Sequence, residues 1–349
     1  MISEIRLRQF RSYLDSKFVL SSGVNVVVGP NASGKTNLLE AVMVVGRGGS
    51  YRAPDADLVM HNKNWARIDT ITGEDKRALK ISVSSLPAKE LVINNKVHKR
   101  ITSALQIPVV LFEPGHLNML SGSPDARRRY IDGVLEQIDA GFKKAKKDYE
   151  RVLRQRNNLL KKGVAARNEF FPWDVRLSQL AGLMVVARTE LIDALNKEIG
   201  GVYGSIAGKK TPIAIIYESK INPLQYESQM LKKLEGSFEL DRLRGYTGVG
   251  PHRDDLKILI NNKESTLVAS RGESRTIIVS LKALEADILN HSLGLAPIIL
   301  LDDVFSELDI RRSSRLSSFL DKYQSLITTT DSSHNPGRDS KANIIKTKA

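Results

Sequence analysis

The sequence predicts an α/β fold whose main domain is built from both ends of the chain, with a helical lobe inserted between them. Three observations predict it: a strand–loop–helix pattern near the start, an apolar run that ends in two aspartates near the end, and a basic helical segment between them. We expect the main domain to span residues 1–120 and 245–349, and the helical lobe to span 121–244.

The first pattern is SGVNVVVGPNASGKTNLLEAVMVV, residues 22–45. Val24–Val28 is rich in β-branched residues and Thr36–Val45 carries helix-forming residues, while Gly29–Thr36 between them fits the phosphate-loop pattern G-x-x-x-x-G-K-[ST]. Glycines let backbone N–H groups face phosphate oxygens, Lys35 can reach the β and γ phosphates, and the Thr36 hydroxyl can ligate Mg²⁺. A glycine-rich turn without a ligand is the alternative. The expected nucleotide contacts are Gly29, Pro30, Asn31, Ala32, Ser33, Gly34, Lys35, Thr36 and Asn37.

The second pattern is APIILLDDVFSELD, residues 296–309, in which Asp302 and Asp303 directly follow an apolar run. A carboxylate at the end of a buried strand is costly unless a cation meets it. We expect Asp302 to hold Mg²⁺ beside Thr36, and Asp303 to orient or activate the attacking water. With Lys35, Asp303 is the expected catalytic residue. A chance pair of acids at a strand end is the alternative.

The charge balance indicates a polyanionic partner. The chain has 349 residues, a formal net charge of +14 and a pI near 9.7. With 6% aromatic residues, contact with phosphates is expected rather than base stacking. Cysteine is absent, which excludes disulfides and thiolate sites, and neither a signal peptide nor an apolar run of membrane-spanning length is apparent. We therefore expect a cytoplasmic protein without a membrane partner.

The third pattern is a basic helix over residues 141–162. Its part from 143 to 162 carries nine basic residues against two acidic ones. We expect a surface that follows DNA phosphates without sequence preference, and a solvated helix face is the alternative. A second helix, 173–199, is expected to pack against it. Arginines 127–129 follow a helix start at Ser123 and Pro124. The candidate DNA contacts are Arg127, Arg128, Lys143, Lys144, Lys146, Lys147, Arg151 and Arg154.

A helix start at Ser270–Arg275, before the acid pair, resembles the signature motif of the ATP-binding-cassette superfamily. The resemblance implies a P-loop NTPase of the ABC/SMC-like head type, in which Ser270 and Gly272 contact ATP bound to a second copy, so that ATP drives homodimerisation. SELD, 306–309, resembles the loop at that dimer interface, and Thr330 stands where the superfamily's switch histidine is usual. The superfamily's faster hydrolases place glutamate where this chain has Asp303, so slow turnover is expected.

Three further stretches, LRQFRSY from Leu7, LFEPGHLNMLSGSPDARRRYID from Leu111 and GYTGVGPHRDDLKILINN from Gly245, resemble the RecF family. The resemblance covers nearly the whole chain. It implies a weak ATPase of recombinational DNA repair, replication restart and the SOS response. Such a protein binds double-stranded DNA near single-strand gaps and junctions, and works with RecR and RecO to load RecA. It also places Arg11 near the nucleotide.

The sequence departs from the family pattern at two positions. Ala32 replaces the usual glycine, which is tolerable if that residue has a negative φ. Glu273 replaces the usual glutamine and would add negative charge near a partner's phosphates. His252–Asp255 favours a structural or nucleotide-sensing role, and the last residues, 332–349, are expected to be loosely ordered.

Two other functions share the phosphate motifs. An SMC-like structural chromosome ATPase would need long coiled-coil heptads, which are missing. A transporter ATPase would depend on a membrane partner and would not need the basic insert.

Overall fold

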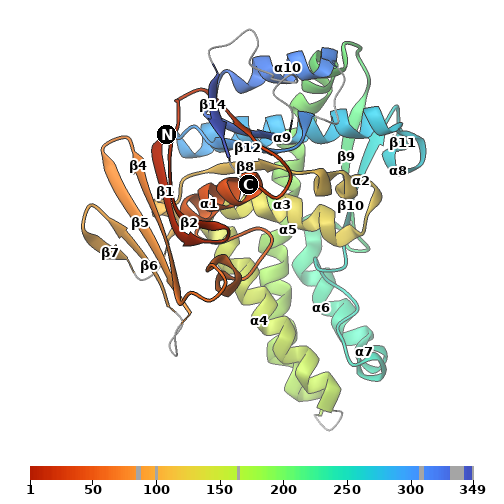
Figure 1. Ribbon diagram of the computed structural model, residues 1–349. Coiled ribbons are helices and arrows are strands. Elements are labelled where there is room, and N and C mark those ends of the chain that lie inside the picture. Colours follow the sequence, from red (N-terminus) through yellow and green to blue (C-terminus); the bar gives the residue numbers. More distant parts are fainter. Residues whose placement is uncertain (84–87, 99–100, 163–165, 306–309, 331–341, 348–349) are drawn as a thin grey trace. The chain divides into compact units, whose positions relative to one another are not determined.

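The computed structural model describes residues 1–83, 88–98, 101–162, 166–305, 310–330 and 342–347. The chain forms two compact units, one of residues 1–116 and 275–349 and one of residues 117–274 (Figure 1). The sequence had placed the second boundary near 245. Residues 245–274 belong to the second unit because β10 in this segment pairs with β9 along its whole length.

The first unit contains a parallel sheet with strand order β14-β3-β13-β12-β8. The strands of this sheet are β14 (Asn343–Lys346), β3 (Val24–Val28), β13 (Ser325–Thr329), β12 (Ile298–Asp302) and β8 (Val109–Phe112). The strand expected at Val24–Val28 is therefore confirmed. The expectation of a loosely ordered C-terminal segment is wrong for β14, whose short apolar pair Ile344–Ile345 lies among polar residues.

A second, antiparallel sheet in this unit has strand order β2-β1-β4-β5-β6-β7. Its strands are β1 (Ile2–Phe10), β2 (Tyr13–Val19), β4 (Trp65–Thr72), β5 (Asp75–Ser82), β6 (Ala88–Ile93) and β7 (Lys96–His98). Asn94 and Asn95 join β6 to β7 with φ of 48° and 65°, as in the two-residue hairpin turns that asparagine favours.

Helix α1 (Lys35–Arg47) lies in the hydrophobic core that the two sheets share. Every residue from Leu38 to Gly46 is buried, so this part of the helix has no solvent-exposed face. The core takes Ile5 and Leu7 from β1, and Ile298 and Leu300 from β12. This packing fixes the position of the loop that precedes α1.

The parallel sheet is buried on its other face as well, since Ile299, Leu301 and Ile327 are almost inaccessible but lie outside that core. Helices α9 (Arg271–Leu293) and α10 (Ile310–Leu320) lie on this side (Figure 1). The short helices of the first unit are η1 (Asp55–Leu58) and η2 (Ser103–Leu105), and η3 (Pro114–Leu117) leads into the second unit.

The second unit is built on two long helices that pack against each other, α4 (Ala140–Lys162) and α5 (Arg167–Ala207). Both were expected from the sequence. A three-stranded sheet, β11-β10-β9, was not expected. The remaining elements are α2 (Asn118–Ser121), α3 (Pro124–Ile138), β9 (Ile213–Glu218), η4 (Pro223–Gln225), α6 (Tyr226–Gly236), α7 (Phe238–Arg244), β10 (Asp255–Ile260), β11 (Lys263–Glu264) and α8 (Ser265–Val268).

A buried arginine holds the helices of the second unit together. Arg156 of α4 is fully buried and donates to Asp174 at 2.6 Å and to Asp241 and Thr247 at 2.8 and 2.9 Å. Arg156, one of the nine basic residues of the segment 143–162, is therefore part of the interior and not of the exposed surface.

Within the described ranges, no helix combines the length and the apolar character needed to cross a membrane.

Candidate functional site

The loop between β3 and α1 is held in place by a tyrosine from the start of β2. Gly34 has a φ of 91°, and a Cβ at this position would lie 2.9 Å from the Tyr13 ring. The Tyr13 hydroxyl donates to the Gly34 carbonyl at 3.0 Å, and burial raises the pKa of Tyr13 to about 12. Glycine is therefore required at position 34 both for its backbone conformation and for the space that it leaves.

Ala32 has a φ of 65°. The negative φ that would make alanine tolerable at this position is therefore absent. An L-residue in the left-handed region costs about 1–2 kcal/mol, because its Cβ crowds the following carbonyl. The loop thus holds local strain that a glycine would relieve.

The Lys35 ammonium lies over the loop. Its Nζ donates to the carbonyl oxygens of Gly29 at 2.7 Å and Pro30 at 2.8 Å. Burial lowers the pKa of Lys35, although Asp303 and Asp302 oppose this shift. The ammonium is positioned within the loop, where a bound phosphate would compete with the two carbonyls.

The two phosphate motifs meet at the carboxyl ends of β3 and β12. The Thr36 hydroxyl donates to Asp302 Oδ1 at 3.0 Å, across 266 residues of sequence. Thr328 of β13 donates to the same oxygen at 2.8 Å. A hydroxyl and a carboxylate are hard oxygen ligands of the kind that Mg²⁺ prefers, and the cation commonly completes its shell with water and substrate phosphates. This pair of residues therefore fits Mg²⁺.

Asp303 leaves the sheet with a φ of 51°, and its backbone N–H donates to Thr328 Oγ1 at 2.9 Å. Aspartate is among the residues that tolerate this left-handed conformation. The turn separates the two acids: Asp302 stays beside Thr36, whereas Asp303 is exposed. Different roles for the two carboxylates are thus built into the backbone.

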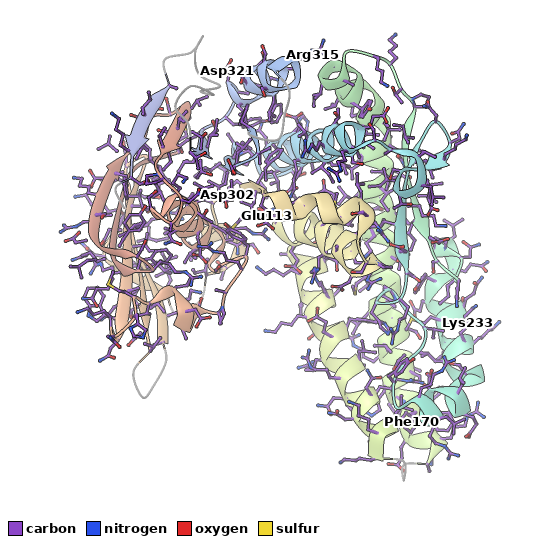
Figure 2. All side chains as sticks on the ribbon, turned by 45° about the vertical axis from the view of Figure 1, so that its right-hand side comes forward. Glu113, Phe170, Lys233, Asp302, Arg315 and Asp321 are labelled. Atoms are coloured by element: carbon purple, nitrogen blue, oxygen red, sulfur yellow. The ribbon has the colours of Figure 1, made fainter. Side chains whose placement is uncertain are left out.

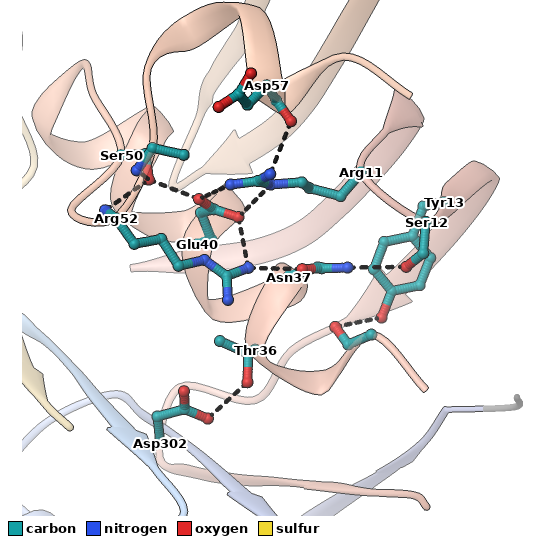
Figure 3. A network of polar contacts seen from close by, with 12 residues as sticks. Arg11, Ser12, Tyr13, Thr36, Asn37, Glu40, Ser50, Arg52, Asp57 and Asp302 are labelled. Carbon is teal, nitrogen blue, oxygen red and sulfur yellow. Dashed lines mark hydrogen bonds and ion pairs between the residues drawn. The ribbon is translucent and has the colours of Figure 1, made fainter. Parts of the chain in front are cut away.

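A buried glutamate in α1 organises the helix next to the loop (Figure 3). Glu40 is fully buried and receives two hydrogen bonds from Arg11, both at 2.8 Å, one from Arg52 at 2.7 Å and one from Ser50 at 2.6 Å. Burial acts to raise the pKa of Glu40, but these hydrogen bonds outweigh it and lower the pKa to about 2. Arg52 also donates to Asn37 at 2.6 Å.

Arg11 is therefore engaged with α1 and with the Asp57 carbonyl. Its role as a nucleotide contact stays a prediction.

Sequence reasoning missed a third acid at this edge of the sheet. Glu113 directly follows β8, whose Phe112 pairs with Leu301 of β12, so Glu113 and Asp302 end adjacent strands (Figure 2). Burial raises the pKa of Glu113, although Lys282 opposes this shift. The signal was present in the sequence, because an acid directly behind an apolar run was the pattern that identified Asp302.

The comparisons with known proteins agree with this geometry. The model of the family described as RecF/RecN/SMC N terminal domain matches residues 1–348. A protein of Clostridium beijerinckii named DNA replication and repair protein RecF is 32% identical over 333 residues, which cover 94% of this chain and 91% of the relative. A protein of the same name from Halalkalibacterium halodurans is 33% identical over 344 residues, covering 95% and 92%. The chain belongs to the RecF family.

Solved structures give the same result for the fold. The structure described as the recombination mediator protein RecF-ATP in the RecFOR pathway matches with a TM-score of 0.86 and 29% identity, covering 95% of this chain and 92% of that chain. An Smc head bound to the C-winged helix domain of ScpA matches with a TM-score of 0.56 and 17% identity, covering 95% and 90%. The expected P-loop NTPase fold of the ABC/SMC-like head type is confirmed.

The signature residues lie where α9 begins. Ser270 and Glu273 form a reciprocal cap: the Glu273 N–H donates to the Ser270 hydroxyl at 3.2 Å, while the Ser270 N–H and hydroxyl donate to the Glu273 carboxylate at 3.1 and 3.0 Å. Lys209 also contacts Glu273 at 3.1 Å. The hydrogen bond from the Ser270 backbone, and then Lys209, lower the pKa of Glu273. The carboxylate that departs from the RecF pattern therefore caps its own helix.

The SELD segment lies outside the described residues, and Thr330 is exposed just beyond β13.

The candidate DNA contacts separate into two groups. Arg127 forms a two-bonded ion pair with Asp255 at 2.8 Å, Arg128 donates to the Asp254 carbonyl at 2.6 Å, and Lys146 contacts Glu136 at 2.7 Å. The charged groups of these three residues are engaged in contacts within the second unit. Lys143 is half-buried. The exposed ones are Lys144, Lys147, Arg151 and Arg154, which lie on one face of α4 opposite its buried residues.

The His252–Asp255 segment makes internal hydrogen bonds. The Tyr149 hydroxyl and His252 Nδ1 are 2.6 Å apart, and His252 Nε2 is 3.2 Å from the Thr247 carbonyl. Because that carbonyl only accepts, Nε2 carries the proton and Nδ1 accepts from Tyr149. Burial lowers the pKa of His252 to about 4. Asp254 accepts from three hydroxyls, those of Tyr217, Ser219 and Tyr226. These contacts favour the structural role.

Proposed function

We propose that this protein is an ATP-dependent DNA-binding protein of DNA replication and recombinational repair, and that it acts as a mediator that helps to load a recombinase. Its membership of the RecF family supports this proposal. The structural observation that carries it is the contact between Thr36 and Asp302, which joins two phosphate motifs from opposite ends of the chain into one site.

ATP is the proposed ligand of this site. The loop amides and Lys35 would hold its phosphates, and Lys35 would exchange the carbonyls of Gly29 and Pro30 for phosphate oxygens. Thr36 and Asp302 would hold Mg²⁺, which when bound neutralises charge on the phosphates. Asp303 would accept a hydrogen bond from the attacking water. The aspartate side chain is one methylene shorter than that of glutamate, so we expect slow hydrolysis rather than rapid turnover. Hydrolysis would then set the time at which the ATP-bound dimer is released.

An ATP-dependent homodimer is proposed because the N-terminus of α9 resembles the signature that completes such sites. Ser270 and Gly272 would contact ATP held by the second copy. Since Ser270 is hydrogen-bonded to Glu273, dimer formation would have to open this cap.

Double-stranded DNA is the proposed partner, with a preference for junctions next to single-strand gaps. The exposed cations of α4 support contact with phosphates. RecR and RecO are proposed as protein partners from family membership, and a cytoplasmic, nucleoid-associated location follows from binding to chromosomal DNA.

The SMC-like alternative is supported by likeness of fold alone. The longest helix among the described residues, α5, has 41 residues and is about 60 Å long, and it packs against α4, α6 and β9 within its own unit. This packing does not favour the arm of a structural chromosome ATPase.

The test is to measure dimerisation and duplex-DNA binding with ATP, with ADP and without nucleotide. Lys35→Met should remove the ATP-dependent part of both, whereas Lys63→Met, at an exposed position of the same unit, should leave them unchanged. DNA binding that ignores both nucleotide and salt would contradict the proposal.

A further inference from the structure

The phosphate loop is held from a second side by the far end of the sequence. Strand β14 pairs in parallel with β3, with Lys346 opposite Val28, and the Thr347 N–H continues the ladder by donating to the Val28 carbonyl at 2.9 Å. Thr347 thus comes to lie beside the first residue of the loop, Gly29.

The side chain of Thr347 reaches into the loop. Its Oγ1 lies 2.7 Å from the Ser33 hydroxyl, and both residues are buried, at 7% and 5% relative exposure. Gly29 is packed against the same residue: a Cβ there would lie 2.2 Å from Thr347 Oγ1 and 2.8 Å from the Thr347 carbonyl oxygen. The first glycine of the phosphate-loop pattern is therefore required by contact with the last strand of the sheet.

We propose that Thr347 is a positioning residue for ATP, which holds the phosphate loop in its binding conformation through the hydroxyl of Ser33. The inference rests on the proposed binding of ATP at this loop. The physical reason is preorganisation: a loop whose amides already face the phosphate site loses little freedom on binding, so fixing it raises affinity without a new contact to the ligand. In this proposal Thr347 acts through Ser33 and not through a contact of its own with the ligand.

Three substitutions in the full-length chain test the inference, with binding of ATP and of ADP measured in the presence of Mg²⁺. Thr347→Val keeps the shape of the side chain but leaves the Ser33 hydroxyl without this partner, so affinity for both nucleotides should fall about three- to tenfold. Thr347→Ser keeps the hydroxyl and should restore most of the affinity. Thr70→Val is the matched control, since the buried Thr70 hydroxyl of β4 has no partner among the described residues and its removal should change nothing.

Coupling with Ser33 separates positioning from a general loss of stability. Ser33→Ala should weaken binding to a similar extent, and the double variant should be no weaker than either single one, because both act through one hydrogen bond. Losses that multiply in the double variant, or a Thr347→Ser variant as weak as Thr347→Val, would overturn the inference.

Two further outcomes distinguish this inference from the proposed function. If Thr347→Val fails to fold, Ser33→Ala alone decides, and unchanged affinity in that variant overturns the inference. If the wild-type chain binds ATP but Thr347→Val binds it equally well, this inference fails and the proposed function stands. If the wild-type chain binds no ATP, both are overturned.

Discussion

At the scale of single residues, the site contains non-glycine residues with a positive φ, a backbone conformation that L-residues seldom adopt. Ala32 and Asp303 have φ of 65° and 51°, and both flank the expected phosphate position. Aspartate tolerates this region, whereas alanine does not. The two positions therefore respond differently to substitution.

Ala32→Gly should raise the free energy of unfolding by about 1 kcal/mol, because glycine adopts the left-handed conformation without strain. Denaturant unfolding of the nucleotide-free protein measures the change. Ala78→Gly, on β5 of the same unit, is the control and should lower stability by a similar amount. A destabilised Ala32→Gly variant would contradict the strain at this position.

Glu273→Gln should tighten the ATP-dependent dimer about three- to tenfold, because it removes a negative charge from the helix end expected to meet the partner's phosphate. Glutamine can still form the reciprocal cap with Ser270, so the helix should stay intact. Analytical ultracentrifugation with ATP gives the dimer dissociation constant. The difference in this constant between Glu273→Gln and wild type should become smaller at high salt. Glu239→Gln, an exposed acid in α7, should have no such effect.

The sequence predicted the loop residues, Thr36 and Asp302 because each belongs to a short pattern with a local cause. It also contained the cap at Ser270 and Glu273 as S-x-x-E, which was overlooked. Thr347 had no pattern, since its role depends on a strand pairing across more than 300 residues.

At the scale of elements, α1 depends on the one charged residue within its buried stretch, Leu38–Gly46. Glu40 has a folded-state pKa of about 2, below its ordinary value of about 4.5. A lowered carboxyl pKa contributes stability above the unfolded-state pKa, and this contribution is lost as the pH falls toward the folded-state value.

Glu40→Gln should lower the free energy of unfolding by about 3 kcal/mol at pH 7, because two arginines lose their shared counter-charge. The difference from wild type should shrink between about pH 4.5 and pH 2, where the wild-type carboxyl is itself protonated. Denaturant unfolding at a series of pH values measures this, with Glu90→Gln, an exposed position on β6, as the control. A difference that does not depend on pH would contradict the charge argument.

Helix α4 presents its exposed cations at intervals of three and four residues, in a row about 15 Å long. Replacing Lys144, Lys147, Arg151 and Arg154 by glutamine should weaken duplex-DNA binding and reduce the slope of log affinity against log salt by up to about 3.6.

Four exposed cations of α6 and α7 provide the matched control, since their replacement removes the same charge elsewhere in the unit. They are Lys232, Lys233, Arg242 and Arg244. Equal losses in slope for the two variants would indicate a general charge effect rather than a binding face.

At the scale of the whole molecule, ATP binding and dimer lifetime are expected to be linked through Asp303. Asp303→Asn should keep the turn, since asparagine also tolerates a positive φ, but should remove the base that orients water. The variant should accumulate an ATP-bound dimer that light scattering detects, with ATP hydrolysis reduced at least tenfold. Asp321→Asn, an exposed acid after α10, should behave as wild type, and an unchanged ATPase rate in Asp303→Asn would refute the assignment.

The division of the chain was harder to predict than its motifs. Strands β3 and β12 and helices α1, α4 and α9 follow from local periodicity. The segment 245–274 was predicted to belong to the main domain, whereas it lies in the second unit, where β10 pairs with β9, which no local pattern shows. The strand β14 was missed for the same reason.

The position of β3 between β13 and β14 has a consequence for synthesis of the protein. The phosphate loop leaves the ribosome early, but both strands that flank β3 are translated near the end, at residues 325–329 and 343–346. A nascent or truncated chain thus carries the complete loop sequence without the sheet that shapes it. We therefore expect that only chains whose translation has passed β14 can bind nucleotide, and that prematurely terminated products are inert toward ATP.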